Sequence, residues 1–305
     1  MMTRFLDPNI ARKKQIVTAH FSAHPVVAHA VPTFSIVEFN LTERCNRRCV
    51  FCPRVDPHVY PNRNVSIPVA LYAHIMQDLA GLSFAGRIVY SAFSEPLLHP
   101  QIADLIHLSR QYCPTAGVEI VTNGDLLTWE KLRGLFDAGL DQISVSMYDG
   151  PHQVAHFREM QEQAGLRDAQ LLLRARYGTA AQQYGMNLSN RAGTVEIPES
   201  GVGTLASPMR SSCFYPFYEL LIDYDGTVLL CPHDWGKHLC AGTLQEQSVL
   251  AVWTGPILTD VRTRLARSDR DFSPCVVCNV AGNLLGQDHF DAWRRCNDTH
   301  GNPGR

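Results

Sequence analysis

Short apolar runs alternate with longer amphipathic stretches from Ser35 onward, and this alternation dominates the first two thirds of the chain. Short apolar runs bounded by turn residues are typical of buried strands, whereas apolar positions three and four residues apart are typical of helices. The predicted strands span 35–40, 88–93, 118–122, 143–147, 171–176 and 186–188. Helices are expected to begin near Ser66, His99, Thr128 and Gln153. Six such βα units predict an α/β fold, a partial (β/α)6 barrel with a parallel sheet.

The pattern changes at 196–208, which is rich in glycine, serine and proline and predicts a linker into a second unit. That unit contains apolar runs at 217–223 and 227–231, separated by Tyr224-Asp225-Gly226. An Asp-Gly pair between such runs predicts a β-hairpin. A helical segment follows over 247–267, interrupted near Gly255-Pro256. We therefore expect an N-terminal extension (1–34), a core domain (35–200) and a small C-terminal domain of hairpin and helix (201–305).

The composition is that of an ordinary globular protein. The 305 residues are 45% hydrophobic with a formal net charge of −2, which gives no general attraction to nucleic acid or to a membrane surface. The sequence shows no apolar run long enough to cross a bilayer and no apolar secretion signal at its start. Ten cysteines in such a chain favour a reducing compartment where thiols bind metals, so we expect a cytoplasmic protein.

Three cysteines follow the first predicted strand with C-x3-C-x2-C spacing, in Cys45-Asn46-Arg47-Arg48-Cys49-Val50-Phe51-Cys52. Thiolates are the usual ligands of iron–sulfur clusters. Three of them can hold three irons of a cubane and leave the fourth iron open to a co-substrate. The alternatives are a zinc site that lacks a ligand and three core thiols, although structural zinc sites usually have four protein ligands. The loop lies at the carboxyl end of a strand, where this class of fold carries its chemistry.

Four cysteines of the C-terminal unit form a second set. The hairpin is expected to bring two of them together, and a C-x2-C knuckle supplies the others: Cys213, Cys231, Cys275 and Cys278. Four thiolates can hold a 4Fe–4S cluster with every iron bound by protein, which suits electron transfer, or a structural zinc ion. The open-site motif earlier in the chain favours the iron–sulfur interpretation.

These motifs resemble those of radical S-adenosylmethionine (SAM) enzymes with a twitch domain, the shortened form of the SPASM auxiliary-cluster domain. The resemblance runs from about Ser35 to the end and includes 84–88, 93–98, 122–125 and 189–193. Within this superfamily the sequence is similar to aminocyclitol dehydrogenases and aminoglycoside epimerases of antibiotic biosynthesis. The resemblance implies SAM and two [4Fe–4S] clusters as cofactors, with Cys45, Cys49 and Cys52 holding the open cluster and the second set holding the auxiliary one.

The resemblance also assigns contacts to SAM. Phe51 should lie near the adenine. Ser94 and Glu95 stand in the Gly-Gly-Glu-Pro-like motif that binds the methionine amine, with serine in place of a glycine. A carboxylate at a strand's carboxyl end, aimed at an ammonium, would also form a charge-assisted hydrogen bond.

Other polar residues at strand ends have less specific roles. Asn123, Ser144 and Ser146 are candidate ribose ligands or simply polar strand ends, and the two serines share one face of their strand. By resemblance, Arg191 contacts the substrate; the alternative is a salt bridge at the domain junction. Val121 stands where a related dehydrogenase has a tyrosine near its substrate, so the substrates are expected to differ.

The outcome of the reaction is decided after a hydrogen atom has been abstracted from an unactivated carbon. In an epimerase a metal-free thiol returns a hydrogen atom to the opposite face, whereas in a dehydrogenase the alcohol loses a proton and the auxiliary cluster takes an electron. Cys240, between hairpin and helix, is the candidate thiol, and its alternative role is that of a small core residue. Cys240 makes epimerisation of an aminoglycoside or amino sugar our leading hypothesis and dehydrogenation of a secondary alcohol the alternative.

A peptide-modifying maturase and a non-catalytic iron–sulfur scaffold are further alternatives. The residues before Ser35 are too few for a peptide-recognition domain, and a scaffold would not need the open cluster. The expected partners are a small cationic substrate and an external one-electron reductant of the flavodoxin or ferredoxin type. Carboxylates available for a cationic substrate are Asp149, Glu196, Glu199 and Asp234.

Overall fold

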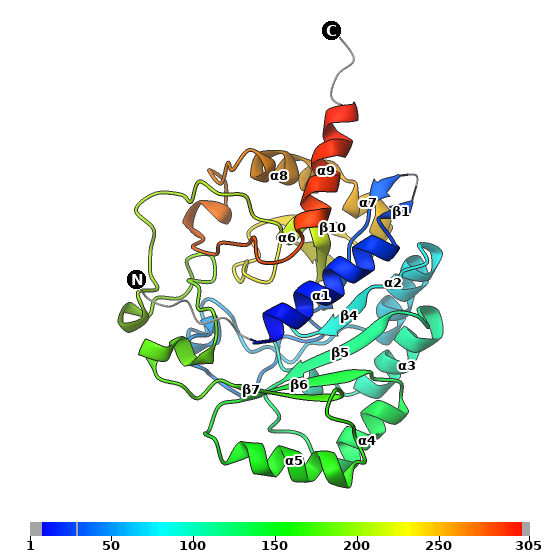
Figure 1. Ribbon diagram of the computed structural model, residues 1–305, viewed down its shortest axis with the longest axis vertical. Helices are drawn as coiled ribbons and strands as arrows, with labels where there is room; N and C mark the ends of the chain where they lie inside the picture. Colours follow the sequence, from blue (N-terminus) through cyan, green and yellow to red (C-terminus); the bar gives the residue numbers. More distant parts are fainter. Residues whose placement is uncertain (1–7, 29, 301–305) are drawn as a thin grey trace.

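The computed structural model describes residues 8–28 and 30–300 (Figure 1). In this part of the chain, eight strands form one sheet in the order β10-β9-β8-β3-β4-β5-β6-β7. Its strands are β3 (Ile36–Phe39), β4 (Arg87–Tyr90), β5 (Gly117–Thr122), β6 (Gln142–Met147), β7 (Leu171–Ala175), β8 (Glu219–Ile222), β9 (Thr227–Leu229) and β10 (Cys240–Thr243). Strands β8 and β3 to β7 are parallel, whereas β9 and β10 are antiparallel to their neighbours. A separate pair consists of β1 (Val26–Ala28) and β2 (Val31–Pro32).

Helices cover the parallel strands on their outer side (Figure 1). These are α2 (Val69–Gly81), α3 (Ile102–Tyr112), α4 (Trp129–Asp137) and α5 (Gln153–Gln163). On the opposite side lies α1 (Pro8–Ala23), whose Arg12 pairs with Glu119 of β5 at 2.9 Å. The C-terminal unit adds α6 (Tyr215–Tyr218), α7 (Val249–Trp253), α8 (Pro256–Ala266) and α9 (Gln287–His300). Within the described ranges, none of the helices has the length and apolar character that crossing a membrane requires.

The first five predicted strands and the four predicted helices are confirmed, but the strand expected at 186–188 does not form. Positive φ angles at Gln183 and Tyr184 turn the chain within η3 (Ala180–Gly185), and the following residues stay irregular. The sixth parallel strand is β8, the first strand of the predicted hairpin, which pairs with β3 from Ile36 opposite Glu219 to Phe39 opposite Ile222. The C-terminal unit therefore completes the sheet of the core instead of folding apart from it.

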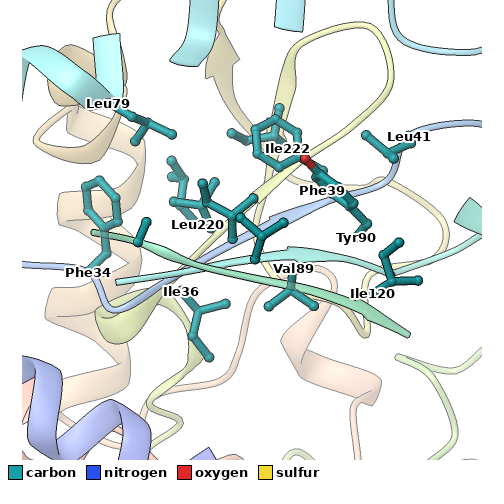
Figure 2. Close-up of a cluster of buried hydrophobic side chains, with 14 of the residues drawn as sticks. Phe34, Ile36, Phe39, Leu41, Leu79, Val89, Tyr90, Ile120, Leu220 and Ile222 are labelled. Atoms are coloured by element: carbon teal, nitrogen blue, oxygen red, sulfur yellow. The ribbon is translucent and has the colours of Figure 1, made fainter. Parts of the chain in front are cut away.

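A continuous apolar layer explains this arrangement. Figure 2 shows Leu220 and Ile222 of β8 beside Phe39 of β3 and Leu79 of α2, and all four are at most 1% exposed. Full burial of such a side chain contributes roughly 1.5–3 kcal/mol. Strand β8 buries its apolar side chains in the same core as β3, which favours their pairing. The alternative strand at 186–188 offers only Met186 and Leu188, both partly exposed.

Candidate active site between two cysteine sets

One cavity of about 420 Å³ lies against the carboxyl ends of the parallel strands. The loop after β3 contributes Cys45, Cys49 and Cys52 to its wall, and β4 to β7 contribute residues at or just after their ends. The C-terminal unit supplies the facing wall through Pro232, His233 and the segment 279–285. The chain thus brings both cysteine-bearing regions to one cavity.

The first cysteine loop is held by polar contacts to its own backbone. The Cys45 N–H donates to Asn62 Oδ1 at 2.9 Å, and Asn62 Nδ2 donates back to the Cys45 carbonyl at 3.2 Å. Arg54, which is buried, donates to the Glu43 carbonyl at 3.0 Å. The loop is therefore positioned before any cofactor binds.

Arg47 anchors the outer side of the same loop. Its guanidinium forms ion pairs with Asp125 at 2.5 Å and Asp149 at 2.5 Å. These two aspartates follow β5 and β6, so the pairs fasten the cysteine loop to two strand ends. Asp149 is thereby occupied by Arg47, and it does not line the cavity as a carboxylate for the substrate.

The three thiols of this loop lie within electrostatic reach of one another. Burial, followed by the neighbouring Cys52 and Cys45, raises the pKa of the Cys49 thiol to about 12. Burial also raises the pKa of Cys45 and of Cys52. Metal binding requires thiolates and releases the protons of the thiols. A bound cluster would therefore offset the unfavourable burial and mutual repulsion of three negative sulfurs in one loop. The donor set fits an iron–sulfur cluster with one iron free of protein ligands.

Glu95 lies beside this loop at the end of β4 and is 2% exposed. Its carboxylate accepts hydrogen bonds from the Leu97 N–H at 3.0 Å, the Thr122 hydroxyl at 2.7 Å and the Asn123 N–H at 2.8 Å. Burial raises the pKa of Glu95, and these hydrogen bonds oppose the rise. The carboxylate is therefore fixed at the cavity wall next to the cysteines, and its role in binding the SAM amine stays a prediction.

Asn123 touches the cysteine loop directly. Its Nδ2 donates to Asn46 Oδ1 at 2.8 Å and approaches Cys45 Sγ at 4.0 Å. The residue lines the cavity, where a ribose of SAM could reach it. Its role as a ribose ligand stays a prediction. N–H donors to ligand sulfurs also influence the potential of a cluster, and this position is suited to that effect.

Phe51 forms an aromatic wall at the same end of the cavity. Its ring stacks on Tyr148 with centroids 6.0 Å apart and packs against Tyr184 at 5.1 Å. A planar adenine can pack against such a surface, so the predicted position of Phe51 remains consistent with its place in the cavity wall.

The three serines differ. Ser94 lines the cavity, and its buried Oγ has no hydrogen-bond partner among the described residues. Ser146 also lines the cavity. Ser144 does not, because its hydroxyl donates to Glu119 Oε1 at 3.0 Å beneath α1. This position fits the alternative given for Ser144, a polar strand residue: its hydroxyl belongs to a network with Glu119 and Arg12.

The four thiols of the second set also converge. Cys213 precedes α6, Cys231 follows β9, Cys275 begins the short helix η5 (Cys275–Val277), and Cys278 follows that helix. Burial, followed by the charges of Cys278, Cys213 and Cys275, raises the pKa of Cys231 well above its usual value. In the described residues no three His, Cys, Asp or Glu side chains close around one point as the ligands of a single metal ion would. Four mutually close thiols fit a multi-iron cluster bound entirely by protein.

Backbone wraps the second set tightly. Gly282 has φ +71°, and a Cβ there would lie 2.2 Å from Cys213 Sγ, so this position requires glycine. Arg270 is 1% exposed and donates to the carbonyls of Ser211 at 2.8 Å, Val280 at 2.7 Å and Ala281 at 2.9 Å. The guanidinium thereby holds together the two segments that carry the cysteines.

Arg191 lies in the cavity between the two sets. Its φ is +46°, and its Nη1 is 3.4 Å from His233 Nδ1. The positive charge of Arg191 acts on both Cys52 and Cys278. Arg191 makes no ion pair with a carboxylate of the described chain, so the domain-junction salt bridge is not seen, and substrate contact stays a prediction.

Cys240 lies outside the cavity. It opens β10, its side chain is exposed, and its thiol contacts the Lys237 carbonyl at 3.8 Å. The predicted hydrogen-donor role requires a thiol that faces the substrate, whereas pairing with Leu229 of β9 places Cys240 on the edge strand of the sheet. The cysteines that line the cavity in the described chain are those of the first loop.

The carboxylates that line the cavity were not found by sequence reasoning. Asp149, Glu196, Glu199 and Asp234 do not line this cavity, whereas Glu38 and Glu219 do. The available signal was a glutamate within each of two otherwise apolar strands. Its meaning depended on the register of β8 against β3, which the sequence pattern does not reveal.

Comparison with known proteins agrees with this geometry. The model of the radical SAM superfamily matches residues 39–161, and that of the SPASM iron–sulfur cluster-binding domain matches residues 213–280. The S-adenosyl-L-methionine-dependent 2-deoxy-scyllo-inosamine dehydrogenase of Niallia circulans is 29% identical over 249 residues, 81% of this chain and 93% of the relative. The GTP 3′,8-cyclase of Chlorobaculum tepidum is 32% identical over 115 residues, 38% of this chain and 33% of that protein.

A solved structure of BtrN in complex with AdoMet and 2-DOIA shares this arrangement over most of its length. Its TM-score is 0.67 at 28% identity, and the alignment covers 84% of this chain and 97% of BtrN. The similarity therefore spans the core and the C-terminal unit together.

Proposed function

Taking the chain as a radical SAM protein with a C-terminal SPASM domain, whose cofactors are SAM and two iron–sulfur clusters, we propose that it oxidises a secondary alcohol of an aminocyclitol or amino sugar to a ketone. One observation carries the proposal. A single cavity is bounded by the first cysteine loop and by segments that flank the second set. A substrate held there lies between a site of hydrogen abstraction and an electron acceptor. Similarity to a dehydrogenase over 81% of the chain supports oxidation over epimerisation.

The proposed ligands follow from the two thiol sets. Cys45, Cys49 and Cys52 would hold the cluster that binds SAM, and the second set (Cys213, Cys231, Cys275 and Cys278) would hold the auxiliary cluster. Glu95 would accept hydrogen bonds from the ammonium of SAM, since its carboxylate is fixed by three donors at the cavity wall. Phe51 would pack against the adenine, and Ser146 and Asn123 would bind the ribose.

When bound, SAM and the first cluster supply a radical that removes one hydrogen atom from a C–H bond, and the second cluster can take up one electron. Arg191 would donate an N–H to the hydroxyl oxygen on the same carbon and stabilise negative charge as the proton leaves. The aromatic wall of Phe51, Tyr148 and Tyr184 would keep water from the reacting carbon. The alcohol loses one hydrogen atom, one proton and one electron, which is the change from alcohol to ketone.

A mass measurement tests this proposal. The reduced enzyme is incubated with SAM and 2-deoxy-scyllo-inosamine or an amino-sugar panel in deuterated water. Dehydrogenation gives a product that has lost two hydrogens, with 5′-deoxyadenosine formed alongside. A product of otherwise unchanged mass that has gained one solvent deuterium would instead establish epimerisation.

The matched control is Cys240→Ala. Because Cys240 is exposed away from the cavity, this variant should form the ketone at the wild-type rate. Loss of an inverted product in Cys240→Ala, with SAM cleavage retained, would contradict the proposal and restore the hydrogen-donor role of this thiol.

A further inference from the structure

Two glutamates face each other across adjacent strands on the cavity wall. Glu38 lies in β3 and Glu219 begins β8, and both line the cavity. In the parallel register Ile36 is opposite Glu219, and Glu38 is opposite Leu221. Since side chains alternate along a strand, Ile36 and Glu38 share a face with Glu219. The two carboxyl groups are therefore diagonal neighbours on the inner face of the sheet.

The two glutamates are positioned by the fold, and one carboxyl oxygen of Glu219 has no hydrogen-bond donor in the described chain. Glu219 is 9% exposed, and the charge of Glu38 acts on its carboxyl group. Glu38 Oε1 also accepts the Ala92 N–H at 2.9 Å. Glu219 Oε1 is buried at the cavity and has no hydrogen-bond partner among the described residues. A buried carboxyl oxygen without a donor is costly, and a ligand donor would remove that cost.

The two carboxyl groups are close enough for the charge of Glu38 to act on Glu219. Burial, followed by the charge of Glu38, raises the pKa of Glu219 well above its usual value. Lys13 of α1 also lines the cavity, and its positive charge acts on Glu219. Within the described residues, Lys13 forms no ion pair with either glutamate.

The other charged side chains of the cavity wall are basic, with the exception of Glu95. Basic side chains line it at Lys13, Arg47, Arg54, Arg174, Arg176 and Arg191. The other carboxylate of the described wall is Glu95, whose oxygens already accept three hydrogen bonds next to the first cysteine loop. A second cation in this cavity would therefore find an open carboxyl oxygen at Glu219.

We propose that Glu38 and Glu219 form the binding site for a primary ammonium group of the substrate. This inference rests on the proposed function and names the feature by which the substrate is selected. The ammonium donates one hydrogen bond to the open Oε1 of Glu219 and brings a positive charge beside the two carboxyl groups. The site lies on β3 and β8 in the wall of the cavity that also contains Arg191, so it would fix the amine at one end of the substrate while Arg191 binds a hydroxyl oxygen.

A binding experiment with two probes tests the inference independently of turnover. Holoenzyme with SAM and no reductant is titrated calorimetrically with 2-deoxy-scyllo-inosamine, and with the analogue in which a hydroxyl replaces the amine. Wild-type protein should prefer the amine by roughly 10- to 100-fold, the usual effect of a hydrogen bond to a charged group. Glu219→Gln should remove most of this preference by weakening the amine probe, with little change for the hydroxyl analogue. Glu38→Gln should act in the same direction.

Glu199→Gln is the control, because Glu199 is an exposed carboxylate outside the cavity, and it should keep the full preference. Iron content and SAM binding, unchanged in both cavity variants, show that the fold persists. Wild-type protein that binds both probes equally, or neither, overturns the inference, as does a Glu219→Gln variant that keeps the preference.

The two proposals fail separately. If Glu219 gives a preference for 2-deoxy-scyllo-inosamine but the reduced enzyme leaves this probe chemically unchanged, the dehydrogenase proposal fails and the ammonium site stands. If the alcohol of 2-deoxy-scyllo-inosamine is oxidised while Glu219→Gln keeps the wild-type preference for the amine probe, the ammonium site fails and the dehydrogenase proposal stands.

Discussion

The two cysteine sets of this protein differ in how they meet the cavity. Cys45, Cys49 and Cys52 line it directly, on a loop fastened by Arg47 and Asn62. The thiols of the second set lie behind the wall, and their chain neighbours, such as His233 and Gly282, face the cavity instead. The first set can thus contact a molecule bound in the cavity, whereas the wall of the cavity separates the second set from it.

The largest expected effect comes from breaking the first set. Cys49→Ala should abolish formation of 5′-deoxyadenosine from SAM, because an iron loses its protein ligand at the cavity face. Iron content after anaerobic reconstitution should fall from about eight atoms per chain to about four. Cys240→Ala is the matched control and should retain both iron and SAM cleavage. A Cys49→Ala protein that still cleaves SAM would remove the functional difference between the two sets.

Removing a ligand of the second set should affect a different step of the reaction. Cys275→Ala is expected to lose about four irons while the first cluster remains and still cleaves SAM. Ketone formation should fall at least tenfold, because the electron left on the substrate carbon has no acceptor. The measurement is the ratio of ketone to 5′-deoxyadenosine. An unchanged ratio would mean that the second set has no role in oxidation.

A smaller effect is expected at the connection between the two regions. Lys237 Nζ forms ion pairs with Glu43 at 2.9 Å and Asp223 at 2.5 Å, and both carboxylates are at most 2% exposed. Glu43 lies just before the first cysteine loop, and Asp223 directly follows β8, the first strand of the hairpin. Lys237→Met leaves both carboxylates without this partner and should lower the free energy of unfolding by about 3 kcal/mol.

Urea titration of the holoenzyme measures that loss, and Lys237→Arg should recover most of it by restoring the charge. A loss below about 1 kcal/mol in Lys237→Met would show that the connection acts as an exposed surface pair.

The smallest expected effect lies away from both sets. His20 and His289 both contact the Ser35 hydroxyl, at 2.7 Å and 2.8 Å, where α1 and α9 meet. Burial, followed by the charge of His20, lowers the pKa of His289 to about 3, below its value near 6.5 in the unfolded chain. The unfolded state therefore binds the proton first, so the contribution of neutral His289 is complete above pH 6.5 and is lost as the pH falls toward 3.

Between pH 7.5 and pH 5 this loss should be about 2 kcal/mol. Unfolding titrations of wild type and His289→Asn at both values measure it, and the variant should lose correspondingly less stability. Equal losses in the two proteins would contradict a neutral, buried His289. Retention of iron at pH 5 would separate this effect from cluster loss.

Much of the fold was predictable because it depends on local patterns. Thr128 was expected at the start of a helix, and it caps α4 by accepting the Lys131 N–H at 3.2 Å. The break near Gly255-Pro256 separates α7 from α8, since proline cannot continue a helix from the preceding turn. The sixth parallel strand was misplaced, because a short apolar segment at 186–188 and the hairpin strand β8 look alike by composition.

The site, like the fold, has features that follow from local sequence and features that depend on distant contacts. Cysteines three or four residues apart must lie close together, so the sequence by itself determined the open thiol set and, through it, the cofactor chemistry. The partners of Ser144, the exposure of Cys240 and the meeting of Glu38 with Glu219 involve strands that are distant in sequence. Only the tertiary structure decided these, because the register between paired strands depends on packing of the whole sheet, and a shift of one residue turns every side chain to the other face.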